Sequence, residues 1–562
     1  MDSLKPQLPK ISDEDRTPLV DVLLELLAWQ QQQIDKLEQE ILKLKGETTK
    51  PKIKPSKMDN DPAKDAAENG DDDKSKKKKG PKRSKTEHLK IDATIDIQPD
   101  NIPEGSTFKG YRKVVIQDIK FETFNTCYRL AEYQTPDGSY VSGQLPDEFN
   151  GCHFGNDLIS FILYQYHHQH VTQPLLLKQL LDLGVEISSG RLSQFITDGL
   201  DVFHDEKDQL LQAGLSVSQY IHTDDTGARH DGKNGYCTHI GNELFAWFSS
   251  TQSKSRINFL SCLGQGSDYF YVLNAGAFAY MEQQKLPHSL LARLELEFAG
   301  EVICSLPLAD PADKVVRIET ALDWQKWLDQ QGIKTKQHRR IISEGALMGG
   351  LLAQGIPATL SIISDDAGQF NVFDHALCWI HAERIINRLI PLNAEHVKAV
   401  DDIREQLWQI YRDLKTYKLD PTAIQAEDIT SRFKTMCSTK TAYVTLNLAL
   451  KRMGSNQHEL LRVLDKPYLP LHNNLSERDI RDYVKKRKIS GSTRSEAGRR
   501  CRDTFASLKK TCLKHKISFW HYLKDRLLGE SNIPPLPDLI RAAATWVMRS
   551  YDWSYEDGLT VE

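Results

Sequence analysis

Three acidic residues occupy positions in the sequence at which carboxylates can hold divalent cations. Asp224 follows an apolar run at 217–223, and Asp365 follows a second apolar run at 358–364. Glu477 lies at the start of a basic, helix-prone segment. Carboxylates at two strand ends and on one helix can converge on two metal ions roughly 3.5–4 Å apart, which activate an attacking hydroxyl and stabilise the leaving oxygen of a phosphodiester. The pattern predicts metal-dependent chemistry on a polynucleotide.

Each acid also has a purely structural interpretation. An aspartate that follows a strand commonly caps a turn or a helix. Glu477 alone would be a first-turn acid that faces Arg481 across one turn of helix. Asp224 and Asp365 come first after their strands, so we prefer them as ligands, and the neighbouring Asp225 and Asp366 remain the alternatives.

The charge distribution points to a polyanionic partner, although the net charge of the 562 residues is only −4. Between 478 and 516 there are fourteen Lys and Arg against four Asp and Glu. A solvated helix face is the alternative, but four acids cannot balance fourteen bases, and such a patch attracts nucleic acid. The residues expected to contact DNA phosphates near the acids are Arg478, Lys485, Arg487, Lys488 and Arg494.

Composition excludes several classes of protein. The nine cysteines are scattered and form no C-x-x-C pair, which suits a reducing cytosol. The N-terminus lacks the features of a signal peptide, and the apolar run at 19–29 is too short to span a bilayer. No G-x-x-x-x-G-K-[ST] loop is present, so a P-loop ATPase is excluded. We expect a cytoplasmic protein with no membrane partner.

The N-terminal third is expected to contain assembly and DNA-binding elements. A heptad pattern within 1–48 predicts a coiled coil that pairs two copies of the chain through residues 19–45, with a single amphipathic helix as the alternative. Residues 49–100 have almost no large apolar side chains, which predicts a disordered linker. Alternating apolar residues with a turn at 136–138 predict a small β-rich unit at 101–152.

Residues 153–215 read as helical, with helix-turn-helix spacing. A first helix from 173, a glycine at 184 and a serine cap before a second helix at 190–196 make up the pattern. The DNA-reading version of this motif would place Ser189, Arg191 and Gln194 near base edges. An ordinary helical hairpin has the same spacing and remains the alternative.

The expected catalytic domain spans 216–530 and is followed by a tail at 531–562. Its predicted elements are strands at 217–223, 236–248 and 256–263, a helix at 343–353 and a strand at 358–364. A ribonuclease H-like α/β core has this order of elements: three strands, a helix and a fourth strand. Acids follow its first and fourth strands, as they do here. Residues 266–340 exceed that core and read as an insertion, and 375–465 read as a helical insertion.

Three motifs, taken together, resemble transposases of the insertion-sequence 66 family. His222 to Gly227 reads H-T-D-D-T-G and is similar to that family's H-[AT]-D-[ED]-T-[PG] block. Asp365 begins D-D-A-G-Q-F, and residues 376–384 read A-L-C-W-I-H-A-E-R, which resembles the second block with its G-C-W-A-H-x-R-R continuation. Residues 473–478 read N-N-L-S-E-R and resemble the third block, N-N-x-x-E-R.

The resemblance implies a DDE transposase. It would hold two Mg²⁺ (or Mn²⁺) ions through Asp224, Asp365 and Glu477, cleave the ends of an insertion element and join the freed 3′-hydroxyl to target DNA. Small accessory proteins of the same element are the further partners implied. The rival interpretations are a structure-specific nuclease on the same fold and a catalytically inert, domesticated DNA-binding protein.

Two features depart from the family pattern. The family commonly has a Cys-rich module before its helical segment, whereas this chain has only Cys127 and Cys152 in that region. Because structural zinc requires four paired Cys or His ligands, no zinc is predicted. Asp224 and Asp365 also lie 141 positions apart, wider than the family pattern, and the insertion at 266–340 accounts for the difference.

Overall fold

The computed structural model describes residues 20, 26–27, 29–30, 89–98, 100, 103–104, 106–146, 153–264, 270–298 and 316–545. The described residues of 89–127 form one unit together with 182–185, and the other described residues form a second, larger unit. Most of the expected coiled coil and the first part of the linker lie outside the described residues, so both stay predictions. None of the described helices is long and apolar enough to cross a membrane.

The expected β-rich region contains one short hairpin. In the larger unit, strands β1 (Glu132–Gln134) and β2 (Tyr140–Ser142) are antiparallel, and every side chain in them is exposed. The turn at 136–138 connects them as expected. No strand forms among the described residues between 106 and 131, so the expected β-rich unit at 101–152 is reduced there to the hairpin. Alternation alone does not hold a strand that has no core to pack against.

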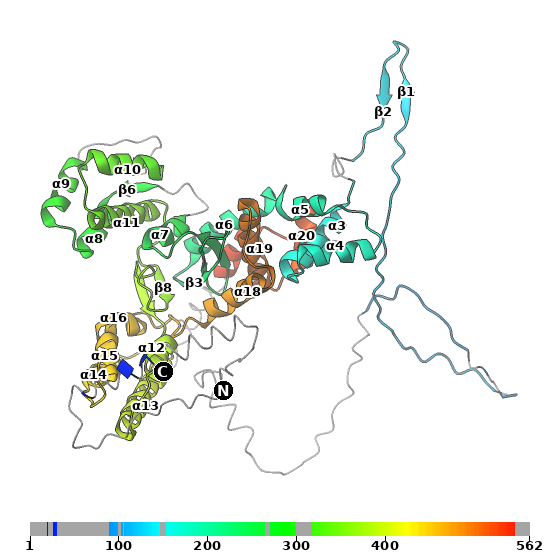
Figure 1. Ribbon diagram of the computed structural model, residues 1–562. Helices are drawn as coiled ribbons and strands as arrows, with labels where there is room; N and C mark the ends of the chain where they lie inside the picture. The colour runs from blue at the N-terminus through cyan, green and yellow to red at the C-terminus, as the bar shows by residue number, and fades with distance from the viewer. Residues whose placement is uncertain are drawn as a thin grey trace, which may run out of the picture. The chain divides into compact units, whose positions relative to one another are not determined.

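The larger unit is built on a five-stranded mixed sheet (Figure 1). Its strands, in spatial order, are β5 (Ala246–Thr251), β4 (Tyr236–Gly241), β3 (Tyr220–Gly227), β8 (Ser361–Ser364) and β9 (Asp374–Leu377). β3 is antiparallel to β4 and parallel to β8, and β8 is parallel to β9. The central strand β3 therefore has neighbours on both sides.

Three expected elements differ from the structure. The strand expected at 217–223 is β3, but it begins at Tyr220 and continues through Asp224 to Gly227 because β4 pairs with it along that length. The strand expected at 236–248 is two strands joined by a tight turn, in which Asn242 N donates to Phe245 O. The third expected strand, 256–263, is helix α7 (Arg256–Gly264). A short apolar run fits either a strand or a buried helix.

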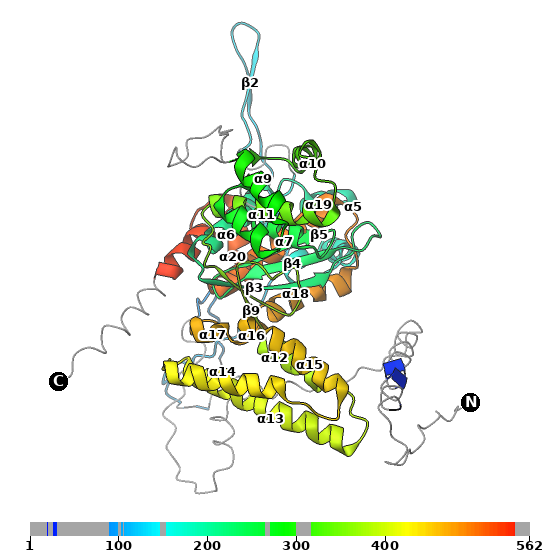
Figure 2. The same cartoon turned by 90° about the vertical axis from the view of Figure 1, so that its left-hand side faces the viewer.

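Both faces of the sheet are buried. The strand alternation places Trp247 in the main core, with α6 (Asp201–Val217), α7 and α11 (Lys336–Ala353). The next residue, Phe248, lies in a second core formed with α18 (Asn474–Ser490) and α19 (Glu496–Lys514). Figure 2 shows the helices of these two layers around the sheet. The acids are thus carried on a rigid, fully covered scaffold.

Helix α19 supplies hydrogen-bond acceptors for backbone N–H groups along the outer edge of strand β5. Side chains spaced four residues apart on the helix accept hydrogen bonds from alternate backbone N–H groups of the strand. A four-residue helical step of about 6 Å nearly matches a two-residue strand step of about 6.8 Å, so the two series stay in register. The bonds are Ser250 N to Asp503, 2.7 Å, Phe248 N to Ser507, 2.9 Å, and Ala246 N to Thr511, 3.2 Å.

The segment expected as an insertion, 266–340, packs directly on the long helix α11. Its described elements are β6 (Tyr271–Leu273), α8 (Ala275–Gln283), α9 (His288–Phe298), β7 (Val316–Ile318) and α10 (Ala321–Gln330). A Cβ at Gly349 of α11 would clash with Val272 O, and one at Gly350 would clash with Phe270 O. Glycine at these two positions is what lets helix and strand backbones approach each other.

The region expected to be a helical insertion, 375–465, begins with strand β9 and continues as helices. These are α12 (Trp379–Asn387), α13 (Ala394–Tyr417), α14 (Ala423–Ser438), α15 (Val444–Ser455), α16 (Gln457–Leu460) and α17 (Arg462–Asp465). α13 and α14 run side by side (Figure 2). Trp379 anchors α12, because its fully buried indole donates to Leu460 O at 2.8 Å.

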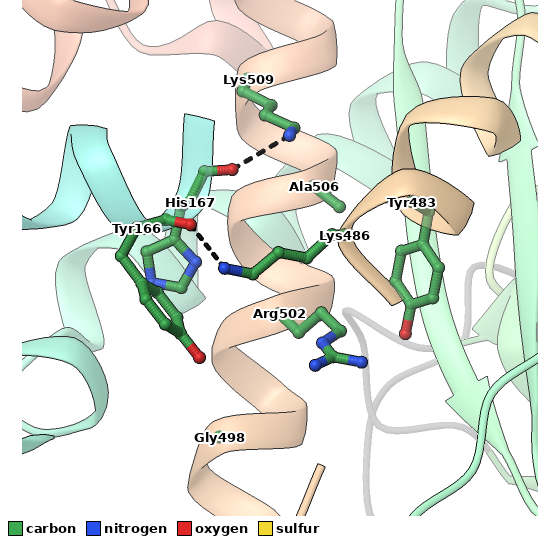
Figure 3. Close-up of a pocket in the computed structure, with 8 residues that line it drawn as sticks. All are labelled: Tyr166, His167, Tyr483, Lys486, Gly498, Arg502, Ala506 and Lys509. Atoms are coloured by element: carbon green, nitrogen blue, oxygen red, sulfur yellow. Dashed lines mark hydrogen bonds between the residues drawn. The ribbon is translucent and has the colours of Figure 1, made fainter. Parts of the chain in front are cut away.

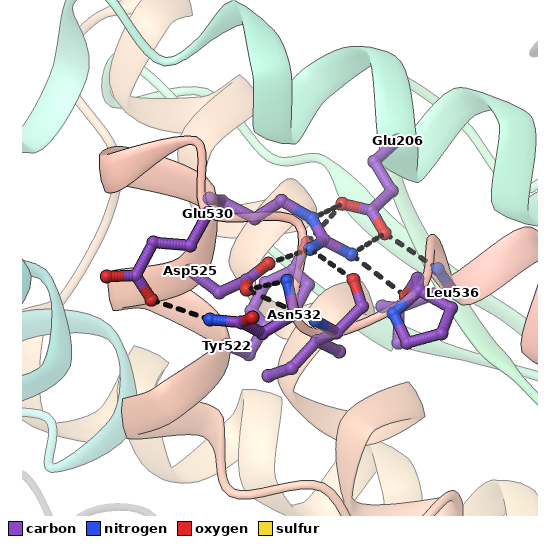
Figure 4. A network of polar contacts seen from close by, with 9 residues as sticks. Glu206, Tyr522, Asp525, Glu530, Asn532 and Leu536 are labelled. Atoms are coloured by element: carbon purple, nitrogen blue, oxygen red, sulfur yellow. Dashed lines mark hydrogen bonds and ion pairs between the residues drawn. The ribbon is translucent and has the colours of Figure 1, made fainter.

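The helical region before the sheet contains α3 (Asn156–Leu163), the π-helical turn η4 (Tyr164–His168), α4 (Gln173–Asp182) and α5 (Ser189–Thr197). A buried polar network ties helix α20 (Phe519–Leu528) and the segment after it to α6 (Figure 4). Glu206 of α6 accepts from Tyr522 Oη at 2.7 Å, from Arg526 Nε at 2.8 Å and from Leu536 N at 2.7 Å. One buried carboxylate thus holds three parts of the chain.

Candidate active site

Asp224 lies in the middle of β3, beside the parallel strand β8. Its Oδ1 accepts the backbone N–H of Asp225 at 2.7 Å. Burial, and after it the negative charges of Asp365, Asp225 and Glu477, raise the pKa of Asp224 to about 7. The three expected acids therefore act on one another electrostatically, so the fold has brought together residues far apart in the sequence.

Asp365 directly follows β8, as expected from the sequence. Its Oδ1 accepts the backbone N–H of Ala367 at 3.2 Å. The carboxyl ends of β3 and β8 point the same way because the strands are parallel. His222 pairs with Ile363, and Asp224 and Asp365 each follow that pair by two residues, so the two acids lie at the same level of the sheet.

The two alternative aspartates are engaged by protein partners. Asp225 accepts from Thr238 Oγ1 at 2.5 Å and from Gln369 Nε2 at 3.0 Å. Asp366 forms an ion pair with Arg452 at 2.5 Å. Neither set of contacts is made by Asp224 or Asp365. Within the described part of the chain, their carboxylates accept only the backbone N–H groups of Asp225 and Ala367.

Glu477 lies in the first turn of α18, where it faces an arginine and a histidine from another helix. Its Oε1 accepts from Arg384 Nη1 at 3.0 Å and lies 3.5 Å from His381 Nε2, both on α12. The expected contact with Arg481, one turn along α18, measures 3.6 Å. No pattern in the sequence pointed to the Arg384 contact beyond the A-E-R that ends the second motif.

Two buried histidines connect the sheet to the start of α18. His222 Nδ1 lies 2.9 Å from Asn473 Oδ1, and His239 Nδ1 lies 2.7 Å from Ser476 Oγ. Asn473 Nδ2 also donates to Thr223 O at 2.8 Å. These contacts fix the turn of helix that carries Glu477 against the strand that carries Asp224, which is a positioning role that sequence spacing does not reveal.

The donor chemistry of the site fits a divalent cation. Mg²⁺ prefers carboxylate oxygens, and a cation would stabilise the ionised form of Asp224, which burial and the neighbouring carboxylates disfavour. Among the described residues, however, no three His, Cys, Asp or Glu side chains are arranged as a ready-made metal site. The carboxylate of Glu477 lies 3.0 Å from Arg384 and 3.5 Å from His381.

The expected DNA-contacting bases of α18 and the loop after it fall into two groups. Arg478, Lys485, Lys488 and Arg494 are exposed. Arg487 is half-buried, and its Nη1 donates to Thr226 Oγ1 at 3.1 Å and to Gly227 O at the end of β3. Arg487 therefore braces α18 against the sheet, whereas the other four are open to solvent.

The second helix of the helix-turn-helix pattern is capped as expected. Ser188 Oγ accepts from Arg191 N at 3.1 Å. Arg191 Nη1 donates to Gln194 Oε1 at 3.1 Å, and its guanidinium lies 4.6 Å from the centre of the Phe195 ring. Arg191 and Gln194 thus share one face of α5, and a role in DNA contact stays a prediction.

Comparisons with known proteins identify the family. Residues 362–500 match the model of the transposase IS66 family, a range that includes Asp365 and Glu477. The chain belongs to that family. It is also 41% identical over 337 residues to an uncharacterised protein, y4jO, of Sinorhizobium fredii, which covers 60% of this chain and 100% of the relative. No solved structure matches this transposase-family chain.

Proposed function

We propose that this chain is a DNA transposase that cleaves insertion-element ends and joins the freed 3′-hydroxyl to target DNA. The proposal is supported by the electrostatic influence of Asp365 and Glu477 on Asp224, since these acids come from the end of β8, from α18 and from β3. The family supports a transposase role. The strand order β5-β4-β3-β8-β9, with β5, β4 and β3 consecutive and antiparallel, supports a ribonuclease H-like core.

The three acids would act as ionised ligands for two divalent cations, Mg²⁺ or Mn²⁺. Such a pair lowers the pKa of a bound water and stabilises the oxygen that leaves the phosphodiester. Asp224 and Asp365 would present their oxygens from the rigid sheet. Glu477 would complete the set after exchanging its contact with Arg384. His222 and Asn473 would keep the two halves of the site in register.

The exposed bases on and after α18 would hold the DNA backbone beside the acids. Arg478 follows Glu477 directly, and Lys485 and Lys488 lie two to three turns further along the same helix. Phosphate contacts of this kind position the duplex without reading its sequence. Arg191 and Gln194 on α5 would supply contacts to base edges.

The proposed assembly is a homodimer through residues 19–45, which would bring two element ends together. Accessory proteins from the same element are further proposed partners. Neither the homodimer nor the accessory proteins are inferred from a contact observed among the described residues.

The test is a strand-cleavage and joining assay on labelled element-end DNA with Mg²⁺ or Mn²⁺. The variants are Asp224→Ala, Asp365→Ala and Glu477→Ala, each checked for folding and DNA binding. Asp366→Ala serves as the matched control, because that aspartate is paired with Arg452. Loss of both cleavage and joining in the three variants, with DNA binding retained, supports the proposal.

The same assay separates the rival functions. Cleavage without joining on a pre-cut element end indicates a structure-specific nuclease. Tight DNA binding without cleavage by the wild type, even with a cell extract that expresses the whole element, indicates an inert DNA-binding protein. Activity that survives Asp224→Ala or Asp365→Ala contradicts the assignment of that ligand.

A further inference from the structure

The Asp365 loop, residues 365–370, is attached to helix α7 at two points. Arg256 is the first residue of α7, and its Nη2 donates to Gly368 O in the middle of the loop at 2.7 Å. Phe370, at the end of the loop, packs edge to face against Phe259 of α7, with the ring centres 5.0 Å apart. A helix outside β3, β8 and α18 thus makes both a polar and an apolar contact with this loop.

The peptide group of Gly368 lies between two contacts that involve aspartates. Ala367 N, one residue before Gly368, donates to Asp365 Oδ1 at 3.2 Å. Gln369, one residue after it, donates through Nε2 to Asp225 Oδ2 at 3.0 Å. A displacement of the Gly368 peptide would therefore disturb the backbone group that orients one proposed ligand and a neighbour of the other.

The other side of the Arg256 guanidinium is held by helix α8 of the insertion and by α11. Its Nη1 donates to Tyr280 Oη at 3.1 Å and to Gln284 Oε1 at 3.2 Å, at the C-terminal end of α8. Nη1 also lies 3.5 Å from the carboxylate of Glu344 on α11. Because a guanidinium is planar and its N–H groups point in fixed directions, these contacts also set the direction in which Nη2 donates.

Glu344 is the acid that anchors Arg256. Its side chain is 3% exposed, and it accepts from Tyr280 Oη at 2.8 Å. A buried carboxylate is costly without a paired cation. Among the described residues, Arg256 and Arg340 are the cations that reach it, with side chains 18% and 58% exposed. Arg256 is the better shielded of the two, so solvent screens its interaction with Glu344 less.

Helix α8 gives this arrangement a closely packed support. A Cβ at Gly345 of α11 would lie 2.9 Å from Ala277 O and 2.8 Å from Met281 Cγ, so the glycine lets α8 and α11 approach each other. Ala277 and Met281 are fully buried in the main core. Because close-packed cores leave little room for displacement, the insertion holds the guanidinium in a defined place.

Other buried cations also hold backbone carbonyls, but in a segment without a proposed ligand (Figure 3). Lys486 Nζ donates to Tyr166 O at 2.6 Å, and Lys509 Nζ donates to His167 O at 3.0 Å. Both carbonyls belong to η4, which carries none of the three acids. Such bonds brace the fold. Arg256 differs because the carbonyl that it holds belongs to the Asp365 loop.

We propose that Arg256 is a positioning residue for the cation site, which holds the Asp365 loop in the place from which its aspartate binds metal. The insertion at 266–340 then has a role, because Tyr280 and Gln284 fix the guanidinium from that module. Contacts outside the ligands orient them and tune metal affinity. Arg256 acts through the backbone and touches neither the cation nor the DNA. The inference rests on the proposed function, since it requires a cation at Asp365.

The test compares Arg256 variants with an arginine of similar burial in the same part of the fold. Arg256→Met removes both sets of bonds. Arg256→Lys keeps a cation beside Glu344 but has one ammonium group in place of the fork, which keeps the experiment decisive if the methionine variant does not fold. Arg339→Met is the matched control. Arg339 is 23% exposed, donates to Ile333 O at 3.0 Å and pairs with Asp329 at 2.6 Å, both within the insertion.

The first measurement is hydrogen exchange over 365–370, followed by mass spectrometry with EDTA present. We expect faster exchange in both Arg256 variants than in the wild type and Arg339→Met, because the loop loses its bond at Gly368 O. The second is Mn²⁺ affinity, from electron paramagnetic resonance of free Mn²⁺ without DNA. We expect a loss of roughly 3–10-fold in the Arg256 variants, below the 10–100-fold typical of groups that bond a ligand directly, and no loss in Arg339→Met.

Tyr280→Phe tests the link to the insertion, because it removes only the hydroxyl that contacts Arg256 and Glu344. It should also weaken Mn²⁺ binding, and its effect should not add to that of Arg256→Met, since both changes break one chain of contacts. Fully additive effects would show that the insertion does not act through Arg256.

The outcomes separate this inference from the proposed function. Exchange over 365–370 that is equal in Arg256→Met and Arg339→Met overturns the positioning role, whatever the Mn²⁺ affinity. Faster exchange with unchanged Mn²⁺ affinity also overturns it, because Arg256 would then brace the loop without serving the site. Both results leave the proposed function standing. A wild type that binds no Mn²⁺, or binding that persists in Asp365→Ala, contradicts the cation site itself and the inference with it.

Discussion

His222 Nδ1 lies 2.9 Å from Asn473 Oδ1, and this contact links the strand of Asp224 to the helix of Glu477. Asn473 Nδ2 donates to Thr223 O, so its Oδ1 is left as the acceptor and His222 Nδ1 carries the hydrogen. Burial lowers the pKa of His222 to about 3, which keeps the ring neutral at physiological pH. The link is thus a neutral, directional hydrogen bond.

Replacing Asn473 should weaken both stability and cleavage. Asn473→Ala leaves His222 Nδ1 and Thr223 O without partners, at a cost of about 1–3 kcal/mol for each buried group. The loosened α18 should lower the cleavage rate while DNA affinity is retained. Urea denaturation and single-turnover cleavage are the measurements. Asn371→Ala, which removes an exposed hydrogen bond to Glu459, is the control, and equal effects in both variants would contradict the link.

Without metal, the stability of the protein should depend on the protonation of Asp224. The native pKa of about 7 is above the usual 3.8, so the native state binds the proton more tightly than the unfolded chain does. The stabilising contribution is complete below about pH 4 and is lost as the pH rises towards 7. We expect a loss on the order of 2 kcal/mol between pH 5 and 7.

Urea denaturation in EDTA across this range checks the prediction. Asp224→Asn should remove that part of the pH dependence, because an amide does not titrate. The same proton competes with a cation for the carboxylate, so Mn²⁺ affinity of the wild type should fall below pH 7. A wild type and Asp224→Asn variant with parallel pH profiles would falsify the assignment of the raised pKa.

Removing Arg384 should free the carboxylate of Glu477 for a cation. A partly exposed ion pair is worth about 0.2–1 kcal/mol, so Arg384→Ala should tighten Mn²⁺ binding roughly two- to fivefold. Electron paramagnetic resonance of free Mn²⁺ measures this without reference to activity. Arg388→Ala is the control, because Arg388 is an exposed arginine that directly follows α12. Weaker Mn²⁺ binding in Arg384→Ala would show instead that the arginine holds Glu477 in a useful orientation.

The Glu206 network should account for a large part of the stability of the C-terminal helices. Glu206→Ala leaves the largely buried Arg526 with only Asp525 as a carboxylate partner, and breaking a buried pair costs up to about 3–5 kcal/mol. Thermal and urea unfolding measure the loss. Arg541→Ala, in an exposed ion pair with Asp538, should change stability by less than about 1 kcal/mol. A similar small change in Glu206→Ala would mean that solvent replaces the network.

The edge of β5 should open when α19 loses one of its acceptors. Ser507→Ala leaves Phe248 N–H unpaired at a buried position, at about 1–3 kcal/mol. Hydrogen exchange at the Phe248 amide should accelerate, because that N–H depends on the helix for its partner. Exchange of the β4 amides, which bond to neighbouring strands on both sides, serves as the internal reference. Unchanged exchange at Phe248 would show that the helix does not protect this edge.

The sequence by itself determined the chemistry-bearing residues and their local settings. An aspartate after the apolar run 358–364, a glutamate in the first turn of a basic helix and three motifs in order are all local patterns. The family match at 362–500 covers the second and third of these motifs. Local patterns failed where a short apolar run fits both a strand and a helix. The run at 256–263 was expected to be a strand and forms a helix.

The tertiary structure decided which of these residues meet and what surrounds them. The pairing of Glu477 with Arg384, the bond between His222 and Asn473, and the burial of Lys486 all join residues from different elements. Such contacts depend on strand order and helix packing, which arise from the whole chain rather than from any short window. The same is true of the raised pKa of Asp224, because burial and the charges of distant acids exist only in the folded state.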